Sequence, residues 1–149
     1  MLVGVPGSGK STWAENQDWI NTCAYASTDM WVDFEAKQQG KTYSEVFKEY
    51  MPKAVDLMAG QVVLAREKDI DIIWDQTSTT VASRKRKFRM LPSYRAIAVV
   101  FKTPEREVLD IRLASRVGKH IPKNVIDSMI AGWEEPSSSE GFDEIWHVS

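Results

Sequence analysis

The sequence predicts a three-layer α/β sandwich with a mostly parallel sheet of about five strands. Short apolar runs of strand length alternate with segments of helical periodicity along the whole chain. The runs 70–74 and 96–101 are almost continuously apolar, as strands are when helices cover both faces of a parallel sheet. The chain of 149 residues, 43% hydrophobic and 27% charged, suits one domain over residues 1–149.

The first elements along the chain are expected to be a strand, a loop, a helix and a second strand. Residues 1–5 form an apolar strand that leads into a glycine-rich turn, and residues 10–18 begin a helix. Residues 23–26 follow as a short strand, and the polar residues 27–29 mark a strand end or a helix cap. Functional side chains commonly lie at such strand ends.

The rest of the chain continues the same alternation. Helical spacing covers residues 43–67, with Pro52 as a start or a kink. Further elements are expected as strands at 70–74 and 96–101, a helix after Pro104, a loop around Gly118, a helix from about Pro122 and a last strand at 145–148.

A phosphate-binding motif, G-x-x-x-x-G-K-S, is formed by Gly4, Gly9, Lys10 and Ser11 between the first predicted strand and helix. Glycines let successive backbone N–H groups converge on phosphate oxygens. Lys10 is expected on the β- and γ-phosphates and the Ser11 hydroxyl on magnesium, so the motif predicts ATP and Mg²⁺ as cofactors. The predicted nucleotide-binding residues are Gly7, Ser8, Gly9, Lys10, Ser11 and Thr12, the last with helix initiation as its alternative role.

Two aspartates at predicted strand ends are the candidate acid–base and metal groups. Asp29 follows the strand at 23–26, where a kinase places the base for its acceptor hydroxyl; its alternative role is a helix N-cap. Asp75 follows the strand at 70–74, where a Walker B aspartate orients magnesium; its alternative role is a turn residue. Together with the phosphate motif, they predict an ATP-dependent phosphotransferase with a hydroxyl acceptor.

The segments GVPGSGKSTWA, STD at 27–29, IIWDQT and RLASR before Pro122 resemble the kinase domain of phage polynucleotide kinases over the whole chain. The resemblance implies the 5′-hydroxyl of DNA or RNA as acceptor, Asp29 as the catalytic base, and Arg112 and Arg116 as lid arginines that hold the ATP phosphates. Arginines four residues apart also share a helix face, from which they can stabilise phosphoryl charge. The alternative for this pair is a solvated helix face.

The chain also departs from that family. Val32 stands where the family has an arginine that contacts substrate phosphate, and Gln76 separates Asp75 from Thr77 where the family has an adjacent pair. The second half is similar to the P-loop module of heterogeneous nuclear ribonucleoprotein U, an RNA-associated protein, so a non-catalytic ATP-binding module is the alternative to an enzyme. Alternative acceptors are a 5-hydroxymethyl pyrimidine in phage DNA and a small nucleoside or sugar.

A basic run at residues 84–89 is the densest positive segment and is expected at the active-site edge. It suggests contact with a phosphate backbone, and a solvated helix face is the equally weighted alternative. Trp31 is a candidate for stacking on a base. The predicted substrate-binding residues are Asp29, Trp31, Thr77 and Arg84.

Composition limits the remaining possibilities. A net charge of −2 restricts any nucleic-acid contact to a local surface, and the single cysteine, Cys23, excludes an intrachain disulfide. Met1 leads directly into a strand and no apolar run approaches membrane-spanning length, so we expect no signal sequence and no membrane partner. The expected compartment is the cytoplasm, which for a phage protein means that of the host.

Overall fold

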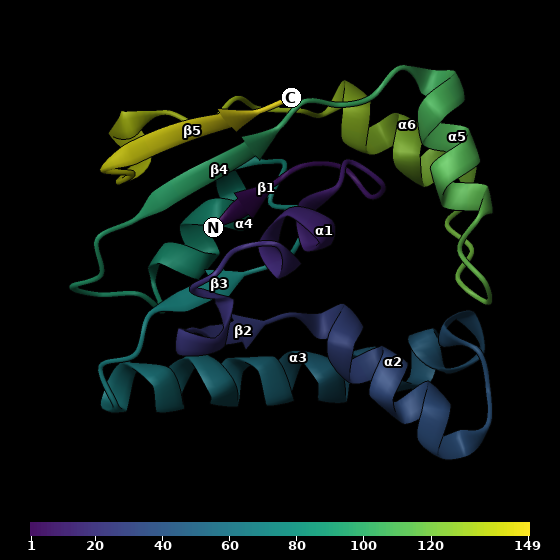
Figure 1. Cartoon of the computed structure of the whole chain (residues 1–149), viewed down its shortest axis with the longest axis horizontal. Helices are drawn as coiled ribbons and strands as arrows, with labels where there is room; N and C mark the ends of the chain where they lie inside the picture. The colour runs from purple at the N-terminus through teal and green to yellow at the C-terminus, as the bar shows by residue number, and fades with distance from the viewer.

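Five parallel strands form the centre of the computed structural model, which describes residues 1–149 (Figure 1). The strands are β1 (Leu2–Val3), β2 (Ala24–Ala26), β3 (Ile72–Trp74), β4 (Ile97–Phe101) and β5 (Glu144–Val148). Strand β4 pairs with β1 and β5, and β2 pairs with β3. The backbone N–H of Gly4 donates to the carbonyl of Thr77 at 2.9 Å, which joins the carboxyl ends of β1 and β3. The predicted α/β fold with a five-stranded parallel sheet is confirmed.

Six α-helices surround these strands: α1 (Lys10–Glu15), α2 (Thr28–Gln39), α3 (Tyr43–Glu67), α4 (Val81–Phe88), α5 (Arg106–Ala114) and α6 (Lys123–Ala131). In Figure 1, α3 runs beside β2 with α2 at its end, whereas α5 and α6 lie beyond the end of β4. None of the helices is both long enough and apolar enough to cross a bilayer.

The three layers follow from the alternation of side chains along the strands. Leu2 and Val99 pack with Ala14 of α1 on one face of the sheet. Their neighbours Val3 and Val100 point to the other face and pack near α4. Successive strand residues are therefore buried on opposite faces, which explains why the β4 sequence is apolar throughout.

Helix α3 has the predicted bounds of 43–67, although Pro52 is not its start, and α2 extends further than predicted. Pro52 lies inside α3, and the helix continues through it over all 25 residues. A capping box between Thr42 and Glu45 fixes the start of this helix upstream of the proline. The residues of α2 were predicted only as a possible helix start, because their polar sequence gives a weak amphipathic signal; in the structure Ser27 caps a helix of 12 residues.

Candidate active site

The phosphate loop joins β1 to α1 at the carboxyl edge of the sheet. Gly7 and Gly9 have φ values of 83° and 98°, which L side chains rarely adopt. A Cβ on Gly4 would lie 2.5 Å from the Ser8 Oγ, and one on Gly7 would lie 2.8 Å from the Leu109 Cδ1. Glycine is therefore required here both by the backbone conformation and by the close approach of α5.

Lys10 lies below this loop with only 8% of its surface exposed. Its Nζ donates to the carbonyl of Val5 at 3.0 Å. Burial lowers the pKa of Lys10 to about 8, the Asp75 carboxylate opposes this shift, and Arg116 adds to it. The Ser8 Oγ is buried and has no hydrogen-bond partner. A buried ammonium beside an unpaired hydroxyl fits the phosphate groups of a nucleotide.

The candidate magnesium site is formed by Ser11 and Asp75. The Ser11 Oγ donates to the Asp75 Oδ2 at 2.7 Å, and the Tyr25 hydroxyl donates to the same oxygen. Burial and then the hydrogen bond to Asp75 raise the pKa of Tyr25, which keeps its hydroxyl protonated. A hydroxyl and one carboxylate suit Mg²⁺, which takes most of its other ligands from water and substrate phosphates. These residues fit the predicted ion.

Asp29 lies in the first turn of α2 and is held by two partners. Its Oδ1 accepts from the Tyr43 hydroxyl at 2.6 Å, and its Oδ2 accepts from the Lys119 Nζ at 2.7 Å. Ser27 is the residue that caps α2, so the N-cap alternative for Asp29 is wrong. The Asp29 side chain remains 52% exposed, so the carboxylate is accessible to a second molecule.

Positive charge keeps Asp29 ionised. Partial burial disfavours the carboxylate, but Lys119, the hydrogen bond from Tyr43 and the Arg116 charge outweigh it, so the pKa of Asp29 lies below its ordinary value. The charge of Asp29 also acts to raise the pKa of Lys10, so the two groups interact electrostatically. An ionised carboxylate at this position can accept a proton from an acceptor hydroxyl.

The two predicted lid arginines lie near the phosphate loop but on different elements. Arg112 of α5 donates from Nη1 to the carbonyl of Gly7 at 3.1 Å. The helix ends at Ala114, so the predicted common helix face with Arg116 is wrong. Arg116 lies in the following loop, where it is one of the charges that act on both Lys10 and Asp29.

Residues 115–122, here called the lid loop, are docked on the N-terminal end of α3. The N–H of Ser44 donates to the carbonyl of Gly118 at 3.0 Å, and the N–H of His120 donates to the Ser44 Oγ at 2.8 Å. Gly118 has φ 71°, and a Cβ there would lie 2.8 Å from the Cβ of Thr42. This docking brings Lys119 to Asp29.

Two predicted substrate-binding residues have structural partners instead. Arg84 has no exposed surface; it forms a bidentate ion pair with Glu140 and donates from Nη1 to the carbonyl of Ser78. The prediction that Arg84 contacts substrate is therefore wrong. The Nε1 of Trp31 donates to Gln61 of α3 at 3.0 Å, and its partly buried ring packs against the α2–α3 core, so stacking on a base stays a prediction.

The basic run also departs from its predicted place at the active-site edge. It forms α4, which leads away from that edge. The pKa of the Met1 amino group, at the opposite end of β1, is lowered mainly by burial and further by the nearby charge of Lys87. Only Lys85, Arg86 and Arg89 of this run are exposed. The solvated-face alternative therefore fits these three residues, whereas Arg84 and Lys87 of the run are buried.

The other predicted residues lie at the same edge of the sheet as the phosphate loop. Thr77 is half-buried beside Gly4, and Thr12 is exposed in the first turn of α1. Gln76 is held by Trp74 and Thr28, which leaves Asp75 as the residue that meets Ser11. Val32 is fully buried in the α2–α3 core.

Sequence reasoning missed three site residues. Tyr25 lies in the middle of β2, Tyr43 begins α3, and Lys119 follows Gly118 in the lid loop. The hydroxyl of Tyr25 within an apolar strand and the cation in the predicted loop around Gly118 were signals in the sequence. No sequence spacing links Lys119 to Asp29, because 90 residues separate them.

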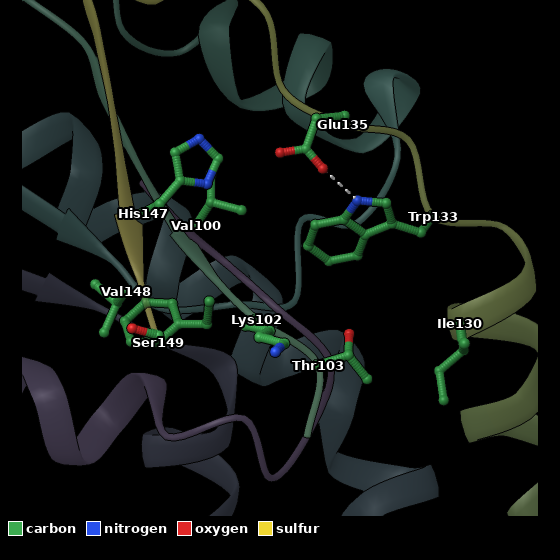
Figure 2. A pocket seen from close by; sticks show the side chains of 10 residues that line it. Val100, Lys102, Thr103, Ile130, Trp133, Glu135, His147, Val148 and Ser149 are labelled. Carbon is green, nitrogen blue, oxygen red and sulfur yellow. Dashed lines mark hydrogen bonds between the residues drawn. The ribbon is translucent and has the colours of Figure 1, made fainter. Parts of the chain in front are cut away.

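A pocket of about 540 Å³ opens at the carboxyl ends of β4 and β5 (Figure 2). Its lining includes Phe101, which lies 3.1 Å from the position of a Cβ on Gly4. Figure 2 shows the Trp133 ring held by its Nε1 hydrogen bond to Glu135, on the side of the pocket away from His147. Five of its ten lining residues are apolar, and the other five are Lys102, Thr103, Glu135, His147 and Ser149.

The chain was compared with models of known protein families. A family model described as an AAA domain matches residues 1–136, and this match supports a P-loop kinase-like domain. The matched range includes the phosphate loop, Asp29, Asp75 and the lid loop. Only the segment that contains η2 (Ser138–Glu140) and β5 lies beyond it.

Proposed function

The chain belongs to this family of P-loop kinase-like AAA domains, and we propose that it transfers the γ-phosphate of ATP to a hydroxyl, with the 5′-hydroxyl of a polynucleotide as acceptor. The observation that carries the proposal is the position of Asp29. It is an ionised, half-exposed carboxylate near Lys10, so an acceptor hydroxyl bound to it can face a phosphate held by the loop.

In the proposed reaction, the acceptor oxygen forms a bond to the γ-phosphorus while the bond between this phosphorus and the β–γ bridging oxygen breaks. The acceptor proton passes to Asp29, and ADP leaves with the electron pair of the broken bond. Lys10, Arg112 and Arg116 stabilise the negative charge on the phosphates. Ser11 and Asp75 would hold a magnesium ion, which would supply further positive charge to the phosphates.

The polynucleotide acceptor rests on the sequence resemblance to phage polynucleotide kinases. Two observations favour a second candidate, a small hydroxylated molecule such as a nucleoside or sugar. Val32 is buried where that family has a phosphate-contacting arginine, and in the basic run Arg84 is buried and Lys87 lies near the Met1 amino group, at the other end of β1 from the loop. A small acceptor needs neither contact, because Asp29 alone can orient its hydroxyl.

The test is transfer of label from γ-labelled ATP to a panel of acceptors. The panel holds 5′-hydroxyl DNA and RNA oligonucleotides, DNA that contains 5-hydroxymethyl uracil, and free nucleosides and sugars. The Lys10→Ala protein serves as the blank, because it lacks the cation that binds the β- and γ-phosphates.

The proposal predicts label at the 5′ end of an oligonucleotide. Label on a nucleoside, sugar or modified base would retain the kinase reaction and replace the acceptor. Binding of ATP without label on any acceptor would contradict the kinase proposal and favour a non-catalytic ATP-binding module.

A further inference from the structure

We propose that Lys119 is a positioning residue for phosphoryl transfer: the lid loop places it on Asp29, where it fixes the orientation of the carboxylate toward the acceptor. The inference rests on the proposed function, because it concerns how the acceptor-side carboxylate of that same site is prepared. In this proposal, phosphoryl transfer requires the lid loop to be docked on α3, whereas ATP binding does not.

The geometry leaves Asp29 one defined orientation. Tyr43 binds one carboxylate oxygen at 2.6 Å and Lys119 binds the other at 2.7 Å. The two donors also contact each other, since the Lys119 Nζ lies 4.2 Å from the centre of the Tyr43 ring. The Lys119 side chain is only 15% exposed, so its ammonium is shielded by these neighbours. Each carboxylate oxygen retains a free lone pair for an acceptor hydroxyl.

Lys119 is supplied by a loop and not by the helix that holds Asp29. The backbone of the lid loop meets Ser44 on both sides of Lys119, through the carbonyl of Gly118 and the N–H of His120. These two bonds fix the path of the chain at residues 118 and 120. The ammonium therefore reaches Asp29 only when the lid loop is docked on the N-terminal end of α3.

Several charged or titratable groups surround Asp29. They are Tyr43 of α3, Arg116 and Lys119 of the lid loop, Lys10 of the phosphate loop, and Asp33 of α2. Lys119 makes the only ion pair with Asp29, at hydrogen-bonding distance. Removing the Lys119 charge should therefore raise the pKa of Asp29, because burial still disfavours the carboxylate. Arg116 and the Tyr43 hydrogen bond would remain to oppose that rise.

The experiment compares Lys119→Met, which has a side chain of similar length but no charge, with Lys119→Arg, which keeps the positive charge. Lys123→Ala is the matched control, an exposed lysine four residues on with no ion pair. A 5′-hydroxyl DNA oligonucleotide is the acceptor probe. The measurements are kcat and KM for ATP across pH, and the ¹³C titration of Asp29 in selectively labelled protein.

We expect Lys119→Met to lower kcat by about tenfold to a hundredfold, the usual effect of losing one charged hydrogen bond, with KM for ATP within about twofold. The acidic limb of the pH profile should move to higher pH, together with the ¹³C titration of Asp29. The reason is that a carboxylate base works only above its pKa, and this pKa rises. Lys119→Arg should restore most of the rate, and Lys123→Ala should match the wild type.

Failure of this inference is distinguishable from failure of the proposed function. A wild-type protein that phosphorylates the probe, with unchanged kcat and acidic limb in Lys119→Met, would overturn the positioning role alone. A wild type that binds ATP and labels no acceptor would overturn the proposed function. In that case an unmoved ¹³C titration of Asp29 in Lys119→Met would overturn the inference as well, whereas a titration moved to higher pH would support the Lys119–Asp29 interaction.

Discussion

Arg84 shows how much a single residue's role depends on its partner. The sequence places it first in a basic run, whereas the structure buries it against Glu140 and the carbonyl of Ser78. A guanidinium can stay buried because both the carboxylate and the carbonyl accept from it. The pair ties α4 to the turn before β5, and the Ser78 bond holds the segment after Asp75.

Replacing Arg84 by alanine should destabilise the protein by about 3–5 kcal/mol, because it leaves the Glu140 carboxylate without its buried partner. Urea denaturation measures the change, and Lys85→Ala, at the exposed next residue, should stay within about 0.5 kcal/mol. Burial opposes ionisation of Glu140, but Arg84 and the backbone of Ser137 outweigh it and lower its pKa. The pair's contribution is thus present above the unfolded pKa of Glu140 and is lost as pH falls through the folded pKa. An unchanged denaturation midpoint in Arg84→Ala would refute this structural role.

At the scale of elements, the lid loop is the part of the site that depends most on a backbone detail. Gly118 combines a left-handed φ with an approach to Thr42 that a Cβ would block. Gly40, at the end of α2, has a similar φ of 64° but open space around it. The two glycines therefore separate the effect of backbone strain from the effect of a steric clash.

Gly118→Ala should reduce phosphoryl transfer by about tenfold, because the clash undocks the lid loop and removes a charged hydrogen bond from Asp29. Gly40→Ala should cost only about 1–2 kcal/mol of stability from the left-handed backbone and leave transfer close to wild type. Transfer assays and urea denaturation of both variants test this. Equal rates in the two variants would argue against a role for lid-loop docking.

In the molecule as a whole, the sequence predicted those parts of the fold and of the site that short, contiguous sequence patterns determine. The phosphate loop is a contiguous motif, and Asp29 and Asp75 directly follow apolar strands, so strand order in a parallel sheet brings them to one edge. Tyr43 and Lys119 reach Asp29 from elements whose docking depends on tertiary packing. Arg84 lies on the inward face of α4 because it pairs with Glu140, and this partner is 56 residues away in the sequence, so no local pattern could predict the pairing.

The sequence predicted the distribution of charge only in part: it placed Lys10, Arg112 and Arg116 at the site, but not Lys119, and it placed the basic run there as well. The cations Lys10, Arg112, Arg116 and Lys119 gather at the carboxyl edge of the sheet with Asp29. The basic run instead follows α4, and the buried Lys87 lies near the amino end of β1. The molecule therefore concentrates at one edge the charges that phosphate transfer requires, and Asp29 is the carboxylate among them.

The most direct test of the role of Asp29 is to measure ATP binding and phosphoryl transfer in Asp29→Asn, a variant of nearly the same shape that cannot accept the proton. Transfer from γ-labelled ATP to the wild-type acceptor should fall by at least about a hundredfold, while the dissociation constant for ATP stays within about twofold. Transfer at the wild-type rate in Asp29→Asn would show that Asp29 is not the acceptor-side base.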